Sequence, residues 1–342
     1  MHEAIDAART SRWIEAQAEG SAPPFEFDLI AAGGSNLTFC VTDVNGRRYV
    51  LRRPPVKVLL ATAHDVAREH RIMAALAGTD VPVPLVHGIC HDTEVTGAPF
   101  YLMDFVDGLI LRSQADATGL DEAACLTATE SLIDTQLACH TIDLDAIGLA
   151  DLARHTGYVD RQLTRWRKQY ERGKVRDLPR LEEIHARLAA AIPGPSGPPG
   201  LAHGDYRFDN TILGTDHRIA AVLDWELCTI GDPLADFSWS MMYWNDPGDP
   251  YSFLTSPPTL HPAFIRRDEM IELYAKRSHN DVSDLPYFVV FCWWKMACIA
   301  EGVYGRALAG ASGGGRIQSV EAIAARVDRM LELAAEAARG VL

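Results

Sequence analysis

The segment LAHGDYRFDN (201–210) is the part of the sequence that decides the fold. Two apolar residues lead into His-Gly-Asp, and Asn210 follows Asp205 by five positions. A turn would explain these residue types, and so would a site that holds a proton acceptor and a metal ligand at a fixed separation. The segment VLDWE (222–226) favours the site, because Asp224 follows an apolar run 14 residues after Asn210. A hairpin of that length brings the side chains of Asn210 and Asp224 to one end.

The chemistry of these three side chains indicates a magnesium nucleotide. Asp205, Asn210 and Asp224 offer hard oxygen atoms, and Mg²⁺ prefers one or two protein oxygens together with phosphate oxygens. The seven cysteines are odd in number and form no Cys-x-x-Cys pair. A disulfide framework or a zinc cluster is therefore not expected, and reduced thiols in a cytoplasmic protein are the simpler interpretation.

Composition limits the class of protein further. The chain has 342 residues, 48% of them hydrophobic, which suits two lobes with sizeable cores. A formal net charge of −14 argues against a nucleic-acid partner. The N-terminus shows no basic-then-apolar signal peptide pattern. The apolar stretch 287–300 is too short to span a bilayer and contains Lys295, so we predict a buried helix and no membrane partner.

Periodicity predicts an α+β protein with a small mixed lobe (1–106) and a larger, mainly helical lobe (107–342). A helix is expected near 3–19. Three strands are expected at 25–29, 37–42 and 47–53, followed by a helix at 64–77 and a further strand at 99–106. The large lobe is expected to contain helices at 121–141, 157–171, 179–191, 233–243, 262–279, 285–308 and 317–338. The segments TILG and IAAVLDWE predict a hairpin on either side of TDHR, inserted into the helical lobe.

The motif set resembles a known family. HGD-x4-N, followed by an apolar-Asp-Trp-Glu run and by GDPLADF (231–237), resembles the aminoglycoside phosphotransferase-like small-molecule kinases. These enzymes share the two-lobed protein-kinase-like fold. The chain looks most similar to the branch of kinase domains associated with acyl-CoA dehydrogenases, in segments that cover nearly its whole length: GGSNLTF (33–39), YVLRRPP (49–55), REHRIMAAL (68–76), YLMDFVDG (101–108) and WSMMYW (239–244).

The resemblance assigns roles to the residues around HGD. Asp205 would be the catalytic base, which takes the proton of the acceptor hydroxyl. Arg207 matches the position of a cation near the γ-phosphate, and His203 would brace the loop. Asn210 and Asp224 would bind an Mg²⁺ ion that bridges the phosphates of ATP.

The resemblance also implies a nucleotide site in the small lobe. The turn that covers the phosphates would be formed by Gly33, Gly34, Ser35 and Asn36, since glycine lets backbone N–H groups approach phosphate oxygens. The hinge would run from Met103 to Val106, with the carbonyl of Asp104 and the amide of Val106 facing adenine. Asp236 resembles the aspartate that supports the backbone of the catalytic loop.

One departure from the family pattern concerns the strand lysine, which is replaced by arginine in YVLR. Arg52 is preferred over Arg53 because it shares a strand face with Val50. The helix expected at 64–77 offers a partner, since Glu69 lies on its apolar stripe with Val66, Met73 and Leu76. An acid that faces inward needs a cation, so we predict an Arg52–Glu69 ion pair.

The sequence thus predicts ATP- and Mg²⁺-dependent phosphoryl transfer to the hydroxyl of a small molecule. The acceptor is expected to be an apolar or hydroxyacyl compound, because WSMMYW and 287–304 hold many aromatic and aliphatic residues and one acid, Glu301. The aromatic residues are alternatively simple core. The basic run 165–174 is either a solvated face or a contact for an anionic tail. An aminoglycoside kinase, a catalytically silent nucleotide-binding module and an Mg²⁺-dependent phosphohydrolase stay open, as does the oligomeric state.

Overall fold

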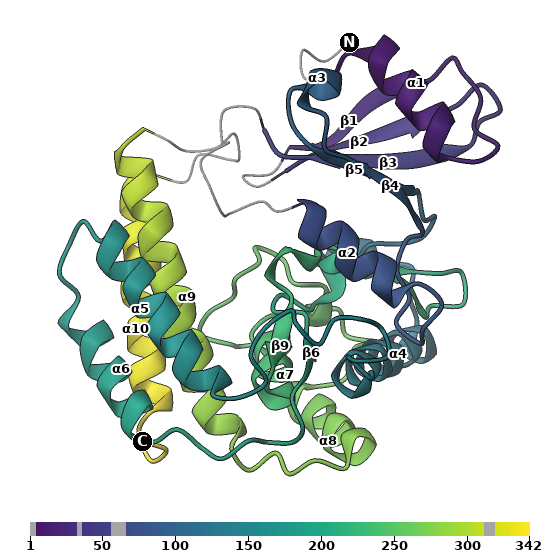
Figure 1. The fold of residues 1–342 in the computed structure, drawn as a ribbon. Coiled ribbons are helices and arrows are strands. Elements are labelled where there is room, and N and C mark those ends of the chain that lie inside the picture. Colours follow the sequence, from purple (N-terminus) through teal and green to yellow (C-terminus); the bar gives the residue numbers. More distant parts are fainter. Residues whose placement is uncertain (1–4, 33–35, 56–65, 311–318) are drawn as a thin grey trace. The chain divides into compact units, whose positions relative to one another are not determined.

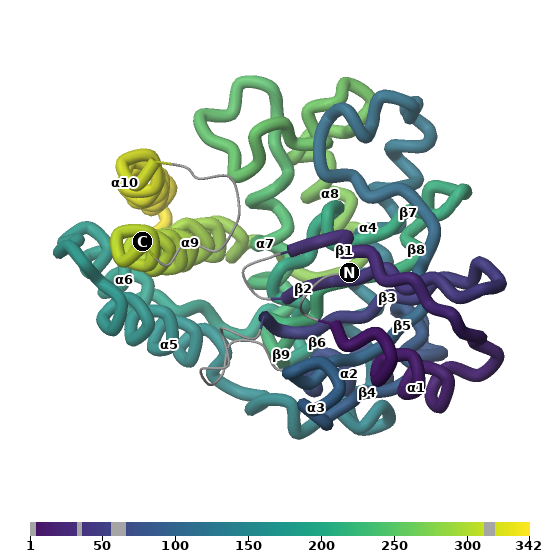
Figure 2. Tube along the Cα trace, turned by 90° about the horizontal axis from the view of Figure 1, so that it is seen from above, coloured from purple at the N-terminus to yellow at the C-terminus, as the bar shows by residue number. Residues whose placement is uncertain are grey.

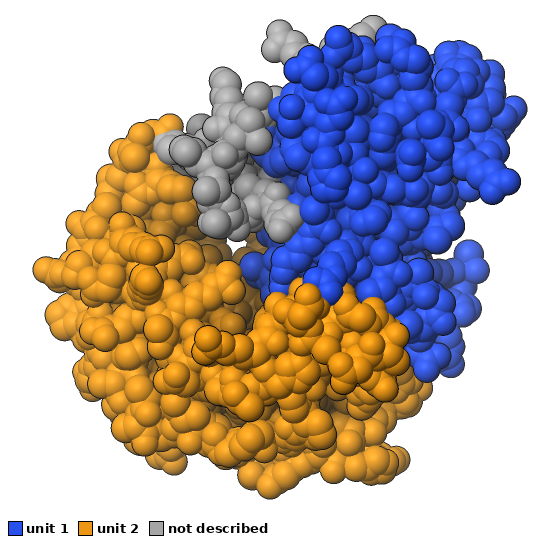
Figure 3. Space-filling model, viewed as in Figure 1, with its two compact units in different colours: residues 1–109, 210–227, 313–315 blue, residues 110–209, 228–312, 316–342 orange. Residues whose placement is uncertain are grey.

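The computed structural model describes residues 5–32, 36–55, 66–310 and 319–342. The chain forms two compact units, coloured separately in Figure 3. Unit 1 consists of residues 1–109, 210–227 and 313–315, and unit 2 of residues 110–209, 228–312 and 316–342. The chain passes from unit 2 back to unit 1 between Asp209 and Asn210.

Unit 1 is built on a five-stranded antiparallel sheet with the order β1-β2-β3-β5-β4. The strands are β1 (Glu26–Ala32), β2 (Leu37–Thr42), β3 (Arg48–Arg53), β4 (Val86–Cys90) and β5 (Phe100–Asp104). Its helices are α1 (Ala7–Gln17), α2 (Val66–Leu76) and the short α3 (Thr93–Thr96). Strands β2 and β3 are joined through Asn45-Gly46, a sequence that is typical of tight hairpin turns.

The strict alternation of side chains along β3 separates two faces of this sheet. Leu51 is fully buried in a core that also holds Ile14 of α1, Phe39 and Leu102. Arg52, the next residue, points to the opposite face, because neighbouring strand residues alternate. Arg52 pairs in register with Tyr101 of β5, so both side chains lie on the face where α2 packs.

The segment 210–227 adds a small hairpin to unit 1. Strands β7 (Thr211–Leu213) and β8 (Ile219–Val222) pair antiparallel, and the 3-10 helix η4 (Trp225–Leu227) follows and packs against α2. Residues 108 and 109 run beside β7. A Cβ atom at Gly108 would lie 2.3 Å from the carbonyl oxygen of Leu213, so only glycine fits this close approach.

Unit 2 is mainly helical. Its helices are α4 (Glu122–Thr141), α5 (Tyr158–Gly173), α6 (Pro179–Ala190), α7 (Pro233–Met241), α8 (Arg267–Ser278), α9 (Leu285–Leu308) and α10 (Val320–Ala337). Short 3-10 helices lie at η2 (Gln114–Ala117), η3 (Phe208–Asn210) and η5 (Pro258–Leu260). Two strands, β6 (Gly200–Ala202) and β9 (Thr229–Gly231), pair antiparallel.

Helix α9 is the central helix of unit 2. Helices α5, α6, α7 and α10 pack against it, and Figures 1 and 2 show α5, α6 and α10 gathered beside it. By length and composition alone, α9 could cross a membrane. Its buried side chains include Phe288, Phe291 and Trp294, and Trp294 donates to the carbonyl of Leu181 on α6, so it is a core helix, as the sequence predicted.

The predicted α+β, protein-kinase-like fold is confirmed, with its small sheet-based part and its larger helical part. The helix expected at 262–279 begins five residues later, at Arg267, because Glu269 accepts a hydrogen bond from the backbone N–H of Arg266 and fixes the helix start there. Strand β4 and the β6–β9 pair were not predicted, since both are short and contain glycine.

Candidate active site

The catalytic-loop candidate, His203-Gly204-Asp205, directly follows β6. Gly204 has a φ of +84°, a backbone conformation that favours glycine. The backbone N–H groups of His203 and Gly204 donate to the carboxylate of Asp236, at 3.2 Å and 2.7 Å. The predicted support of the loop by Asp236 is therefore confirmed.

Asp236 is buried at the first turn of α7 and collects two further donors. The Nε2 atoms of Gln136 and His140, both on α4, lie 3.1 Å and 3.0 Å from its Oδ2 atom. Burial alone would raise the pKa of Asp236, but the bonds from His140 and Gly204 outweigh it and lower the pKa to about 2. The loop is thus anchored to a carboxylate that is ionised at neutral pH.

Asp205, the predicted base, is held by Trp239 of α7 and by residues of its own loop. The indole N–H of Trp239 on α7 donates to its Oδ1 atom at 2.9 Å. Arg207 Nε lies 3.2 Å from the same oxygen. The backbone N–H of Asp205 donates to Nδ1 of His203 at 3.3 Å, so the buried His203 ring braces the turn. This carboxylate is oriented by its surroundings before any acceptor binds.

Arg207 bridges two carboxylates, because its NH1 atom also lies 2.7 Å from Oδ2 of Asp209. Its guanidinium lies 4.4 Å from the ring centroid of Tyr243, a cation–π distance. These contacts show Arg207 holding the candidate base. Its role toward the γ-phosphate stays a prediction.

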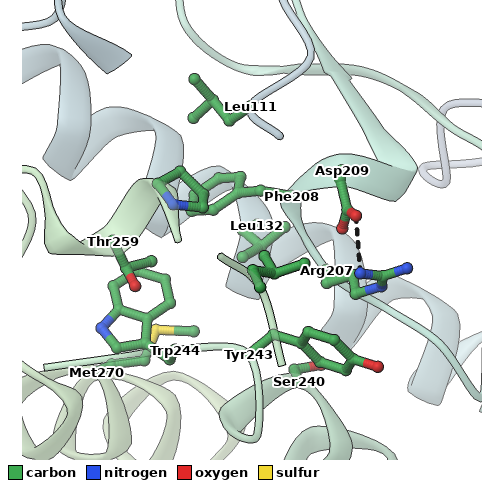
Figure 4. A pocket seen from close by; sticks show the side chains of 12 residues that line it. Leu111, Leu132, Arg207, Phe208, Asp209, Ser240, Tyr243, Trp244, Thr259 and Met270 are labelled. Carbon is green, nitrogen blue, oxygen red and sulfur yellow. Dashed lines mark ion pairs between the residues drawn. The ribbon is translucent and has the colours of Figure 1, made fainter. Parts of the chain in front are cut away.

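Figure 4 shows a small cavity behind this loop, with the Arg207–Asp209 ion pair at one side. Its other walls are mostly apolar and include Leu111, Phe208 and Trp244. The volume of about 20 Å³ admits roughly one water molecule, so the cavity is too small for an acceptor. It belongs to the packing that fixes the loop.

A second set of candidate residues lies in unit 1. Arg52 NH2 is 3.2 Å from Oε1 of Glu69 and 2.5 Å from Oδ1 of Asp224. The predicted Arg52–Glu69 pair is confirmed, and Asp224 extends it to a triad. Arg53 points to the other face, where it is fully buried and donates to the carbonyl of Thr96. The choice of Arg52 over Arg53 is therefore correct.

Glu69 is buried and needs this cation. Tyr101, paired with Arg52 across the sheet, donates its hydroxyl to Oε2 of Glu69 at 3.2 Å. Burial raises the pKa of Glu69 above its usual value, and the positive charge of Arg52 opposes that effect. Removing Arg52 would leave a carboxyl group buried without its cation.

Asn210 and Asp224 flank the open end of the β7–β8 hairpin, as the sequence predicted. The backbone N–H of Leu223 donates to the carbonyl of Asn210 at 2.8 Å, one residue before Asp224. Asp224 has a φ of +65°, a conformation that is uncommon for residues other than glycine and that concentrates at functional sites. Among the residues described, no three His, Cys, Asp or Glu side chains form a metal cluster.

The remaining predicted nucleotide residues are placed as follows. Gly33, Gly34 and Ser35 lie outside the described residues, and the side chain of Asn36 is buried at the start of β2. Met103 and Asp104 end β5, and Val106 follows two residues later. The role of these residues in binding a nucleotide stays a prediction.

Several residues of the candidate site were not assigned from sequence. Gln136 and His140 support the loop from α4, and no motif marks them. Trp239 and Tyr243 lie in WSMMYW, for which core packing and an acceptor role were both open. Lys295 lies over the Trp239 ring and was predicted only as part of a buried helix.

Comparison with known proteins places this geometry in a family. Residues 26–277 match the phosphotransferase enzyme family, which covers most of the chain. The chain is 36% identical over 293 residues to acyl-CoA dehydrogenase family member 11 of Gallus gallus, covering 82% of this chain and 36% of that protein. It is 32% identical over 302 residues to acyl-CoA dehydrogenase family member 10 of Mus musculus, covering 85% of this chain and 27% of that protein. The chain thus spans about a third of the length of these curated relatives.

Solved structures agree with the fold. A protein from Ralstonia eutropha, described as an aminoglycoside phosphotransferase, superposes with a TM-score of 0.81 at 30% identity, covering 98% of both chains. A ternary complex of aminoglycoside phosphotransferase APH(4)-Ia with AMP-PNP and hygromycin B gives a TM-score of 0.63 at 18% identity, covering 96% and 98%. The resemblance inferred from the sequence motifs is confirmed. The chain belongs to the phosphotransferase enzyme family.

Proposed function

We propose that the protein transfers the γ-phosphoryl group of ATP, with Mg²⁺, to a hydroxyl group of a small molecule. The observation that carries this proposal is the fixed carboxylate of Asp205, which Trp239 and Arg207 hold at one oxygen while Asp236 anchors its loop. A base that is oriented before the substrate binds favours proton transfer from a hydroxyl.

In the proposed reaction, Asp205 accepts the proton of the acceptor hydroxyl as its oxygen attacks the γ-phosphorus atom. The bond from that phosphorus to the bridging oxygen breaks, and ADP leaves with the electron pair. Trp239 and Arg207 orient the carboxylate through this step. Arg52 is the candidate cation for the phosphate oxygens, because a guanidinium keeps its charge and can bind two oxygens at once.

Asn210 and Asp224 are the proposed holders of Mg²⁺. The donor set fits, since one carboxylate and one carboxamide suit an ion that takes its other ligands from phosphate and water. When bound, the ion would neutralise charge on the phosphates. The phosphate turn at Gly33, Gly34, Ser35 and Asn36 and the hinge at Met103, Asp104 and Val106 complete the proposed ATP site.

The acceptor is proposed to be an apolar or hydroxyacyl compound. Trp239 and Tyr243 contact the candidate catalytic residues Asp205 and Arg207, so aromatic surface lies beside the base. Glu301, the one acid in the late helix, is fully buried and paired with Arg176 at 3.0 Å. The names of the two curated relatives, both acyl-CoA dehydrogenase family members, also favour an acyl acceptor. We further propose a cytoplasmic location, because all seven cysteines are free thiols.

The test is a transfer assay with γ-labelled ATP against hydroxyacyl-CoA thioesters, sugars, amino alcohols and kanamycin-type aminoglycosides. We expect Mg²⁺-dependent labelling of the hydroxyacyl compounds. Labelling of aminoglycosides alone would replace the proposed acceptor with an antibiotic. ATP binding without transfer to any acceptor would indicate a silent module, and rapid acceptor-independent phosphate release would indicate a phosphohydrolase.

A further inference from the structure

A buried lysine lies one aromatic ring away from the candidate base. Lys295 occupies the middle of α9 and is only 6% exposed. Among the described residues, Lys295 forms no ion pair, and the carboxylates that act on it electrostatically are Asp205 and Asp236. Burying an ammonium without a counter-ion is costly, so a chain that retains one needs a reason other than stability.

Two tryptophan rings account for part of the stabilisation of this ammonium. Nζ of Lys295 lies 3.8 Å from the ring centroid of Trp239 and 5.5 Å from that of Trp166 on α5. Cation–π contacts of this kind offset some of the lost hydration. An ammonium group has three N–H donors, and the cation–π contacts do not supply conventional hydrogen-bond acceptors for them.

Trp239 connects this ammonium to the catalytic loop. Lys295 lies over the face of the indole, while the N–H at the edge of the same ring donates to Oδ1 of Asp205 at 2.9 Å. All three residues belong to unit 2, where α7 packs against α9. The ammonium and the candidate base therefore contact the face and the edge of one indole ring.

The groups that act electrostatically on Lys295 carry charges of both signs. Burial lowers the pKa of Lys295. The neighbouring groups Cys292, Asp205 and Asp236 oppose that effect, and Arg165 on α5 adds to it. On α5, four basic residues spaced by four, three and four positions form one stripe: Arg161, Arg165, Lys168 and Arg172. In the described part of the chain, Arg165, Lys168 and Arg172 show no ion pair, whereas Arg167 pairs with Glu182.

From these contacts we infer that Lys295 is an acceptor-positioning residue, which binds a carboxylate or carbonyl oxygen of the acceptor and disfavours acceptors that carry an ammonium group there. The inference rests on the proposed function, because it places the acceptor hydroxyl at Asp205. An oxygen with negative charge would accept a charge-assisted hydrogen bond from this ammonium. A cationic group at the same place would meet a like charge at short range.

The test uses three ligands with one chain and one changed group: 3-hydroxyoctanoate, octane-1,3-diol and 1-aminooctan-3-ol. Binding is measured by calorimetry with Mg²⁺ and AMP-PNP present, so the result does not depend on turnover. For the parent protein we expect the carboxylate to bind about tenfold more tightly than the diol, the effect of one charge-assisted hydrogen bond, and the amine to bind most weakly.

Lys295→Met should remove most of the difference between the three ligands and leave the affinity for AMP-PNP unchanged. It should keep or raise the melting temperature, because a methionine of similar length buries no charge. Lys295→Arg should retain the preference for the carboxylate. Lys276→Met, which removes an exposed charge on α8, is the matched control and should retain the order of the parent.

An unchanged order of the three ligands in Lys295→Met would overturn the inference, and so would the same change in Lys276→Met. A parent protein that binds the carboxylate no better than the diol would also overturn it. The proposed function fails separately, if the parent binds these ligands in the expected order but transfers phosphate to no hydroxyl compound.

Discussion

Replacing Asp236 with asparagine tests how firmly the candidate catalytic loop is held. The Oδ2 atom of Asp236 accepts from His203, Gln136 and His140, and Oδ1 accepts from Gly204. An asparagine presents an NH2 group in place of one oxygen, so at least one of these donors loses its acceptor. Because the site is buried, that donor cannot turn to water, and the loss should be felt in both folding and turnover.

The pKa of Asp236 gives the size of its contribution to the free energy of unfolding. A pKa of about 2, against 3.8 for an ordinary aspartate, corresponds to about 2 kcal/mol of stabilisation by the ionised form at neutral pH. The pKa is depressed in the folded state, so this contribution is complete above pH 4 and is lost as the pH falls toward 2. About half of it should remain near pH 3.

The assay is urea unfolding of the parent and of Asp236→Asn at pH 7 and at pH 3. We expect the variant to be less stable by about 2 kcal/mol at pH 7 and by about half as much at pH 3. Glu183→Gln, an exposed acid on α6, is the control and should change little at either pH. A loss below about 0.5 kcal/mol at pH 7, or one that does not shrink at pH 3, would refute this reasoning.

Two further predictions concern the nucleotide side. Arg52→Ala and Glu69→Ala should weaken ATP binding non-additively, because both remove the same 3.2 Å contact, and a double-mutant cycle should give a coupling on the order of 0.5–3 kcal/mol. Arg48→Ala on the same strand is the control, and additive effects would contradict the role of the pair. Asp224→Ala should weaken binding of Mg²⁺-ATP more than of metal-free ATP in calorimetric titrations, and an equal loss for both would argue against a metal ligand.

The parts of the structure that sequence predicted well are those with a local cause. Glu69 interrupts the apolar stripe of α2, and an acid on a buried stripe requires a cation, so Arg52 could be named before the sheet was known. The alternation of β3 then separated Arg52 from Arg53. The spacing of Asn210 and Asp224 predicted the hairpin, because its two strands are separated by only a short stretch of chain.

Contacts between distant segments could not be read in this way. Gln136 and His140 meet Asp236 across about a hundred residues, and their helix shows no feature that distinguishes them from other buried polar residues. Lys295 lies in an apolar run, and only the packing of α7 on α9 shows that it reaches Trp239. The lobe boundary at residues 106 and 107 and the nucleotide-binding roles remain predictions.

The central claim is that Asp205 is the base in phosphoryl transfer to a hydroxyl. The most direct measurement compares transfer from γ-labelled ATP and the affinity for Mg²⁺-AMP-PNP in the parent and in Asp205→Asn, with the best acceptor from the screen. An asparagine keeps the size of the side chain and can still accept from Trp239, but it cannot take a proton. We expect transfer to fall by at least about a hundredfold with nucleotide affinity nearly unchanged. Transfer within a few-fold of the parent would contradict the assignment.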